Sequence, residues 1–359
     1  MSALDFVHET RPARVVFGAG ARRHLPRELD ALGLGRALVL TTPGHAALGH
    51  EVAALLGARS VGVHAGAVMH VPVEAARVAA DTARRLGADV CVAAGGGSTI
   101  GLAKAIALES GLPSVALPTT YAGSEMTPLY GLTEGGQKKT GRDWRVMPRV
   151  VVYDPELSRD LPVAVSMASG MNAVAHAAEG LYAQDASPLH RVTAQEGIRA
   201  IARALPRLHA APNDAVARSD ALYGAWLCGS VLGQVQMGLH HKICHTLGGA
   251  FNLPHAELHT VMLPHTLAYN ASAAPQAMAA LGQALGLADA PGLAAPRALQ
   301  GLNARLSLPA TLRDIGLPAQ ALDRAAELAA SAPYPNPRPI ERAALRELLQ
   351  RAFEGADVA

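Results

Sequence analysis

The sequence has few of the features that mark secreted, nucleic-acid-binding or membrane proteins. It contains only 3 cysteines among 359 residues, at positions 91, 228 and 244. None stands in a CxxC spacing, and three thiols cannot all pair, which is typical of a protein kept in a reducing compartment. The segment from Met1 to Arg14 lacks the apolar stretch of a signal peptide, so a cytoplasmic protein is expected.

The chain also lacks a strong charge of either sign. It has 31 Lys and Arg against 29 Asp and Glu, a formal net charge of +2. Binding to a phosphate backbone needs a larger basic excess, so no nucleic-acid partner is expected, whereas a small acidic substrate needs only a few local cations. One uncharged segment, 221–239, approaches the length of a membrane span, but its glycines and glutamines favour a buried helix and no membrane partner.

The organisation of the chain predicts two domains. In the first 150 residues, short apolar runs alternate with helical patterns, which is typical of parallel βαβ units with a nucleotide-sized crevice at the strand ends. Strands are expected at 37–41, 60–64, 90–94, 114–117 and 149–153, and helices at 73–86 and 99–109. On the helix 73–86, one apolar stripe runs from Ala75 through Val78 to Leu86. After Pro155, long stretches rich in Ala and Leu predict an all-helical domain, and no internal repeat is visible.

A glycine-rich turn follows the expected strand 90–94. Gly95, Gly96 and Gly97 lead through Ser98 and Thr99 into a helical pattern. A strand, glycines and a helix in this order can offer free backbone N–H groups to a pyrophosphate, and Ser98 could cap the helix. The spacing is neither the GxGxxG nor the P-loop pattern, so a glycine turn that binds nothing stays an alternative. A second polar segment, 117–127, follows the next strand, and on its own it is better explained as a plain turn rich in Ser and Thr.

Histidines gather in the expected helical domain. Of 15 histidines, those at 240, 241, 245, 255, 259 and 265 lie within one short stretch. His241 and His245 are four residues apart, as are Asn172 and His176, so each pair shares a helix face. A single buried histidine is usually a hydrogen-bonded core residue, but two such pairs and His255 in one domain favour a functional cluster, in principle able to hold a metal.

Four motifs carry a resemblance that covers nearly the whole chain. They are GGGSxxxxAK at 95–104, PTTYAGSE at 118–125, GMNAVAH at 170–176 and HKICHTLGGAFNLPH at 241–255. Together they resemble the iron-containing alcohol dehydrogenase superfamily, in the same order, and VVFGAG at 15–20 and VVYDP at 151–155 also fit. The resemblance implies the dehydroquinate synthase-like fold, with an α/β NAD(P)-binding domain of parallel sheet at 1–157 and an all-helical catalytic domain at 158–359.

The resemblance also implies which residues bind the cofactor. For NADH or NADPH these are the turn Gly95, Gly96, Gly97, Ser98 and Thr99, the later residues Thr119, Thr120 and Ser124, and Thr42. Thr42 stands where the superfamily often has an Asp that bonds a ribose hydroxyl and repels a 2′-phosphate. Without that charge, both cofactors are expected to work.

Most of the superfamily binds a divalent metal through one Asp and three His. The matching positions here are Asn172, His176, His241 and His255, so the anionic ligand is replaced by an amide. This departure, with YAGSEMTP, the 138–145 loop and His240-His241-Lys242, resembles the maleylacetate reductase branch. We therefore expect that no metal is required.

For that branch, the resemblance implies NAD(P)H-dependent reduction of the C=C bond of maleylacetate to 3-oxoadipate in aromatic-compound degradation. His176, His241, His245, His255 and Lys138 are the expected catalytic residues, with His241 and His255 as donors to the enolate oxygen. The substrate is a dianion, and Tyr121, Lys138, Arg142, Asn172 and Lys242 are its expected contacts. A solvated basic loop is the alternative for 138–145. A homodimer is expected, and the competing functions are a metal-dependent alcohol or polyol dehydrogenase and a non-catalytic nucleotide-binding protein.

Overall fold

The computed structural model describes residues 6, 8, 14–135 and 137–358. It forms two compact units, one from residues 11–161 and one from residues 162–359 together with the start of the chain. The two units meet in the sequence between Leu161 and Pro162. The boundary expected from the sequence, between residues 157 and 158, lies four residues earlier. The described part of the start of the chain reaches the second unit at Ser187, whose Oγ lies 3.0 Å from Nδ1 of His8.

The first unit is built on one parallel sheet. Its six strands are β1 (Arg14–Phe17), β2 (Ala37–Leu40), β3 (Ser60–His64), β4 (Val90–Gly95), β5 (Ser114–Pro118) and β8 (Val150–Tyr153), and their order is β1-β8-β5-β4-β2-β3. Every neighbouring pair is parallel. The expected parallel α/β fold is therefore confirmed. The five strands expected from the apolar runs all form, and β1 at the sheet edge comes in addition.

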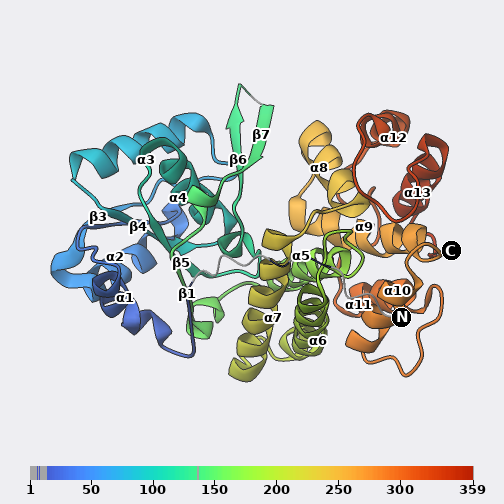
Figure 1. The fold of residues 1–359 in the computed structure, drawn as a ribbon, viewed down its shortest axis with the longest axis horizontal. Helices are drawn as coiled ribbons and strands as arrows, with labels where there is room; N and C mark the ends of the chain where they lie inside the picture. Colours follow the sequence, from blue (N-terminus) through green and yellow to red (C-terminus); the bar gives the residue numbers. More distant parts are fainter. Residues whose placement is uncertain (1–5, 7, 9–13, 136, 359) are drawn as a thin grey trace. The chain divides into compact units, whose positions relative to one another are not determined.

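Alternating side chains on the strands bury both faces of this sheet. Val39, Val92, Leu117 and Val152 share one core with helices α1 (Leu25–Ala31) and α2 (Ala46–Leu56). Helices α3 (Val73–Arg85) and α4 (Gly97–Ser110) pack together, and α4 lies against β4 and β5 (Figure 1). Helices on both faces explain why the strands are continuous apolar runs rather than alternating ones.

The strand order places a ligand crevice at a defined edge of the sheet. From β2 the chain moves outward to β3, and it then returns across β2 to β4 before continuing to β5. The chain therefore leaves β2 and β4 in opposite directions, which is the point where open α/β sheets bind ligands. The turns after these two neighbouring strands begin at Thr41 and Gly96, so Thr42 and the glycine turn lie at the same edge of the sheet.

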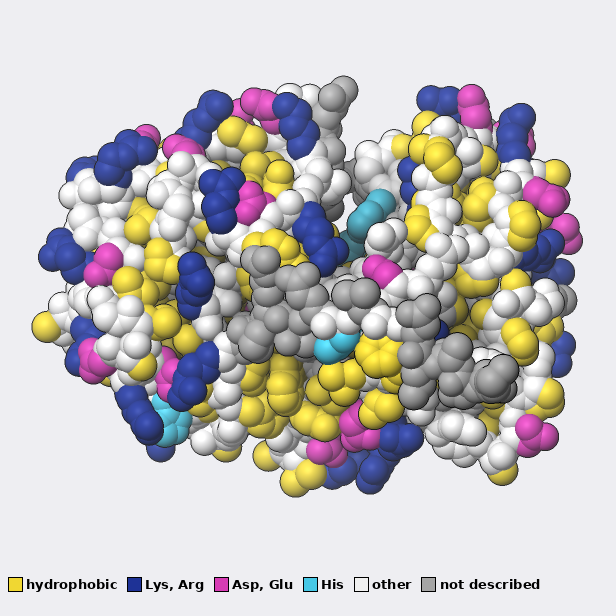
Figure 2. All heavy atoms as spheres, in the orientation of Figure 1, with side chains coloured by type: hydrophobic (Ala, Val, Ile, Leu, Met, Phe, Trp, Pro, Cys, Tyr) yellow, Lys and Arg dark blue, Asp and Glu magenta, His cyan; other side chains and the backbone are white. Residues whose placement is uncertain are grey.

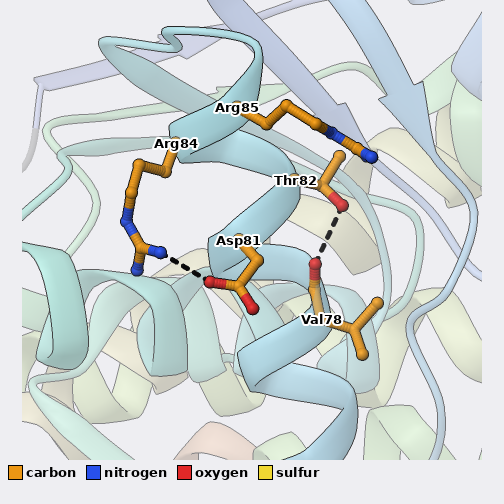
Figure 3. Close-up of a pocket in the computed structure, with 5 residues that line it drawn as sticks. All are labelled: Val78, Asp81, Thr82, Arg84 and Arg85. Carbon is orange, nitrogen blue, oxygen red and sulfur yellow. Dashed lines mark hydrogen bonds and ion pairs between the residues drawn. The ribbon is translucent and has the colours of Figure 1, made fainter.

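Helix α3 buries only part of the expected stripe, namely Ala79 and Ala83. Its buried residues are Ala76, Ala79, Ala80 and Ala83, whereas Val78 is 59% exposed. Alanine side chains are small, so the helix can pack closely against its neighbours without burying larger apolar side chains. Figure 3 shows a hollow beside α3 lined by Val78, Asp81, Thr82, Arg84 and Arg85. All come from one helix, and Asp81 is already bonded to Arg84 at 2.6 Å, so the hollow gathers no side chains from other elements.

The basic stretch near residue 138 is a β-hairpin rather than the expected loop. Strands β6 (Leu129–Glu134) and β7 (Gln137–Arg142) pair antiparallel, with Thr133 opposite Lys138. The polar side chains on β7 hide the alternation that would have predicted a strand.

The second unit consists of helices, as expected. They are α5 (Val163–Gly180), α6 (Pro188–Ala210), α7 (Ala215–Gln234), α8 (Leu239–Phe251), α9 (His255–Asn270), α10 (Pro275–Ala284), α11 (Ala294–Arg305), α12 (Leu322–Ala330) and α13 (Arg342–Glu354). The uncharged segment 221–239 lies mainly in α7, whose inner face is buried, and none of the described helices is long and apolar enough to span a bilayer. Basic and acidic side chains are interspersed on the face drawn in Figure 2.

Candidate active site

The glycine turn after β4 is shaped by close packing. A Cβ atom on Gly95 would meet Thr99 Oγ1 at 2.4 Å, and one on Gly96 would meet Thr120 Cγ2 at 2.9 Å, whereas one on Gly97 would meet nothing within 4 Å. Gly97 is the first residue of α4 and is exposed. The helix N-terminus is thus open to a bound group, as an anion site at a helix start requires. Ser98 does not cap α4 as expected, because the N-cap is Gly96 and no side chain bonds to it.

The segment after β5 lies beside this turn. The Thr119 N–H donates to Gly95 O at 3.3 Å, and Thr120 faces Gly96. Ser124 begins a short 3-10 helix after Gly123, whose φ of 76° suits glycine. Tyr121, an expected substrate contact, is 0% exposed, so its ring packs within the protein. The structure therefore gathers Gly95, Thr119 and Thr120, and it gives the Tyr121 ring no open surface.

A buried lysine links the glycine-turn helix to the hairpin. Lys104 on α4 donates to Thr127 O at 2.9 Å, Thr127 Oγ1 at 3.0 Å and Leu129 O at 2.6 Å. Burial lowers its pKa to about 7, and nearby Glu125 opposes that shift. Burial also raises the pKa of Glu125, which accepts a hydrogen bond from Tyr153 Oη at 2.9 Å. This cluster fixes α4 against the segment that carries Thr119 to Thr127.

The cations of the hairpin have different neighbours. Lys139 Nζ lies 2.5 Å from Glu134 Oε2, and Arg145 bonds to Asp143 at 2.7 Å. Arg142 is exposed, with its guanidinium 5.3 Å from the centre of the Trp144 ring. The Lys138 side chain lies outside the described residues. Lys139 and Arg145 are therefore engaged locally, and Lys138 and Arg142 stay the expected substrate contacts.

Thr42 directly follows Thr41 at the end of β2, as the sequence placed it. Its Oγ1 lies 2.8 Å from Nδ1 of His45. No acidic side chain is bonded to it in the described structure, so the position carries no charge of its own.

In the helical unit, three helices bring the expected histidines together. Asn172 and His176 lie on α5, His241 and His245 on α8, and His255 at the first turn of α9. His176 Nδ1 is 2.8 Å from His241 Nε2, and the His245 and His255 rings stack with centroids 6.2 Å apart. Asn172, His176 and His241 are buried, and His245 and His255 are exposed. The cluster thus has a buried end and an accessible end.

Lys242, an expected substrate contact, points its Nζ toward the Tyr334 ring, 5.8 Å from its centre.

Glu179 is a member of this site that the sequence analysis missed. Its carboxylate accepts from the backbone N–H groups of Gly238, His240 and His241 at the start of α8, and from Tyr182 Oη. His241 Nδ1 lies 2.6 Å from Glu179 Oε2. Burial disfavours the ionised form of Glu179. Its hydrogen bonds with His241 and with backbone amides outweigh that effect and lower its pKa to about 2. Its position three residues after His176, on the same face of one helix, was the available signal.

His259 and His240 were also missed. His259 is one turn after His255 on α9, and its ring centroid lies 4.4 Å from that of His255 and 5.0 Å from that of His241. His240 lies behind them, with Nε2 2.9 Å from His259 Nδ1. Both are 0% exposed. The i, i+4 spacing of His255 and His259 was visible in the sequence.

The chain matches two family models that follow one another along the sequence. Residues 12–155 match iron-containing alcohol dehydrogenase, and residues 166–353 match the C-terminal part of the Fe-containing alcohol dehydrogenase family. The chain belongs to the iron-containing alcohol dehydrogenase family.

Curated members of this family are similar to the chain over nearly its whole length. The maleylacetate reductase of Burkholderia cepacia is 61% identical over 98% of both chains, and that of Pseudomonas sp. strain P51 is 54% identical over 98% of this chain and 99% of its own. Among solved structures, a maleylacetate reductase from Agrobacterium tumefaciens gives a TM-score of 0.95 at 52% identity, covering 98% of this chain and 99% of its own.

Membership in an iron-containing family overturns the expectation that no metal is required. That expectation rested on the amide at Asn172, and it is wrong because the family is one that binds a metal ion. The residues present fit such an ion. Asn172 Oδ1 is buried without a hydrogen-bond partner, and His176 and His241 turn ring nitrogens toward each other. The Glu179–His241 bond is the carboxylate–histidine arrangement that orients metal ligands.

Proposed function

We propose that this chain is a maleylacetate reductase, which uses NADH or NADPH to reduce the C=C bond of maleylacetate to 3-oxoadipate. The observation that carries the proposal is the near-full-length identity of 61% and 54% to maleylacetate reductases. The helical unit supports it, because a buried cluster of histidines and one ionised carboxylate lies where the motifs predict catalysis.

The first unit would hold the cofactor. The glycine turn, Thr119 and Thr120 would contact it, and the N–H groups at the start of α4 would bind its pyrophosphate. The reduced cofactor would supply the hydride for the alkene carbon β to the ketone, and the electron pair of the C=C bond would move onto the ketone oxygen as an enolate. A proton added to the adjacent carbon completes 3-oxoadipate, and the cofactor leaves oxidised.

The histidine cluster serves the enolate stage. His176, His241 and His255, with Asn172, would hold the metal, which would supply the positive charge that stabilises an enolate. Glu179 keeps the proton of His241 on Nδ1 and so leaves Nε2 to face the site. His245 is exposed beside His255 and is the proposed proton donor to carbon. Lys138, Arg142 and Lys242 are the proposed partners of the two carboxylates.

One assay separates this function from its competitor. Purified, metal-loaded protein is mixed with NADH and enzymatically generated maleylacetate, and absorbance of the reduced cofactor is followed. Rapid oxidation of NADH with maleylacetate, and little with a simple aldehyde, is expected. Preference for the aldehyde would replace the proposal with a metal-dependent alcohol dehydrogenase, and no turnover of either would favour a non-catalytic nucleotide-binding protein.

We also propose that the protein works in the cytoplasm as a homodimer. The cysteines at 91, 228 and 244 are all free thiols, which supports a reducing compartment. The homodimer rests on the frequency of twofold assemblies among enzymes. Light scattering during size-exclusion chromatography tests it, and a mass of one chain would refute it.

A further inference from the structure

His259 has no role in the motifs, yet its ring lies in the middle of the histidine cluster. Its centroid is 4.4 Å from that of His255, 5.0 Å from that of His241 and 5.9 Å from that of His176. These three side chains come from three different helices. His259 is therefore the histidine that the other three surround.

A chain of hydrogen bonds fixes which nitrogen of His259 carries the proton. Thr266 Oγ1 has the carbonyl oxygens of Met262 and Leu263 at 3.1 and 3.0 Å, so its single hydrogen is directed to them. Its oxygen then accepts from His240 Nδ1 at 3.0 Å. With the proton on Nδ1, His240 Nε2 is an acceptor, and the group 2.9 Å from it, His259 Nδ1, is the donor.

This series of hydrogen bonds leaves a lone pair on His259 Nε2. His240 and His259 are both fully buried, and in each ring the hydrogen bonds place the proton on Nδ1. A neutral imidazole protonated at Nδ1 carries a lone pair at Nε2. His259 Nε2 is buried and has no hydrogen-bond partner in the structure. An unpaired buried acceptor costs stability, and a bound cation would remove that cost.

We propose that His259 Nε2 is a metal ligand, so that four imidazoles, those of His176, His241, His255 and His259, hold the ion. His259 would supply the donor that the family obtains from a carboxylate at the position of Asn172. Asn172 Oδ1, also buried and unpartnered, adds a weaker neutral oxygen. The proposal concerns the metal site and does not depend on the identity of the organic substrate.

The spacing of the rings agrees with this assignment. Four imidazole nitrogens about 2.1 Å from one ion place their ring centres roughly 5 Å apart in tetrahedral geometry. The centroid separations of 4.4 to 5.9 Å around His259, and 5.0 Å between His176 and His241, lie around that value. His259 also belongs to a group with His240 and Cys244, whose ligand atoms lie within 4.8 Å of one another. Both nitrogens of His240 are already hydrogen-bonded, one of them to His259, so in this arrangement His240 supports the His259 ring.

An all-imidazole site has a predictable metal preference. Neutral nitrogen ligands suit Zn²⁺ and Co²⁺, whereas Fe²⁺ stands lower in the affinity order and loses most when the anionic oxygen is absent. The protein should therefore bind Zn²⁺ and Co²⁺ more tightly than Fe²⁺.

The test is direct metal binding by the full-length protein, with Co²⁺ as the probe. Tetrahedral Co²⁺ bound by imidazoles gives visible d–d bands, and its affinity follows from competition with a chelator. His259→Asn keeps an amide N–H to donate to His240 Nε2 but deletes the ligand nitrogen. It should weaken Co²⁺ binding by more than about 100-fold and change the bands, because even loss of a supporting group costs 10- to 100-fold.

Two further variants act on the hydrogen-bond chain without touching a ligand. Thr266→Val removes the acceptor of the His240 Nδ1 proton, which frees His240 to donate from Nε2 and moves the His259 proton onto its own Nε2. Co²⁺ affinity should fall roughly tenfold, and Thr266→Ser should retain it. Circular dichroism and thermal melting confirm that each variant is folded. Wild-type protein without tetrahedral Co²⁺ bands, or unchanged Co²⁺ affinity in folded His259→Asn or Thr266→Val protein, would overturn the proposal.

Discussion

Thr42 is the residue on which cofactor choice is expected to depend. It follows β2 at the switch point of the sheet, and its hydroxyl is bonded to His45. Wild-type protein should use both NADH and NADPH, with kcat/KM values that differ by less than about a thousandfold. Thr42→Asp should favour NADH by more than about tenfold, because a carboxylate repels the 2′-phosphate. Thr42→Asn is the neutral control of the same size, and an equal shift in that variant would contradict the electrostatic account.

His265 should make stability fall at mildly acidic pH. It lies on α9 at 5% exposure, and burial, with Arg351 as a second cause, lowers its pKa from 6.5 to about 4. Between these values the unfolded chain binds a proton that the folded chain does not. Stability is therefore lost as pH falls from about 6.5 to 4, by at most on the order of 3 kcal/mol.

Denaturant midpoints between pH 7 and pH 4 measure this effect. His265→Gln stays neutral throughout and should show a flatter pH dependence than wild-type protein. His209→Gln, at an exposed position on α6, is the matched control and should retain the wild-type slope. Equal slopes in His265→Gln and wild-type protein would refute the prediction.

Single residues also show how much of the candidate site could be predicted from the sequence. The helix faces of His176 and His241 could be predicted from their spacing to Asn172 and His245, whereas His255 was proposed as the last residue of the 241–255 motif. Glu179 was within reach, since it is one turn after His176. The direction of the His259 lone pair was not, because it is set by Thr266 and His240 through hydrogen bonds that exist only after α8 and α9 pack together. The metal requirement was misjudged, chiefly because Asn172 replaces the anionic ligand of the family.

At the scale of elements, the hairpin β6–β7 is expected to recognise substrate charge. Lys138 lies on β7 opposite Thr133, and its neighbour Lys139 is paired with Glu134. Lys138→Ala should raise KM for maleylacetate by roughly 10- to 150-fold, the equivalent of a lost charge-assisted hydrogen bond of about 1.5–3 kcal/mol. Lys139→Ala is the control and should leave KM nearly unchanged. If KM for NADH rises instead, Lys138 contacts the cofactor.

The elements themselves were predictable where one physical rule dominated. The strands β2, β4, β5 and β8 are buried on both faces, so they appear in the sequence as largely apolar runs. The hairpin β6–β7 was not predicted, because its glycines and cations interrupt the alternation of apolar and polar residues that indicates a strand. On α3 the rule of large apolar side chains failed, since the helix packs through alanines and leaves Val78 exposed. Close packing of small residues leaves a weak signal in the sequence.

In the whole molecule, cofactor and metal should act on different units. The glycine turn, Thr119 and Thr120 belong entirely to residues 11–161, and the histidine cluster belongs entirely to residues 162–359. A ligand stabilises the part that it binds, by about 2.7 kcal/mol at a hundred times its dissociation constant. Local opening of that part, and therefore amide exchange, is suppressed by a similar amount.

Hydrogen exchange with mass spectrometry would show this separation. NADH alone should protect peptides covering the start of α4 and residues 119–124, whereas Zn²⁺ alone should protect α5, α8 and α9. The Gly97→Pro variant, which lacks one of the N–H groups at the start of α4, should lose most of the NADH protection and keep the Zn²⁺ pattern. Protection of α8 and α9 by NADH without metal, or of the glycine turn by Zn²⁺ without cofactor, would show that the two sites are coupled. In that case the assignment of one ligand to each unit fails, because binding of NADH would change the affinity for Zn²⁺ and the reverse, although the two sites belong to different units.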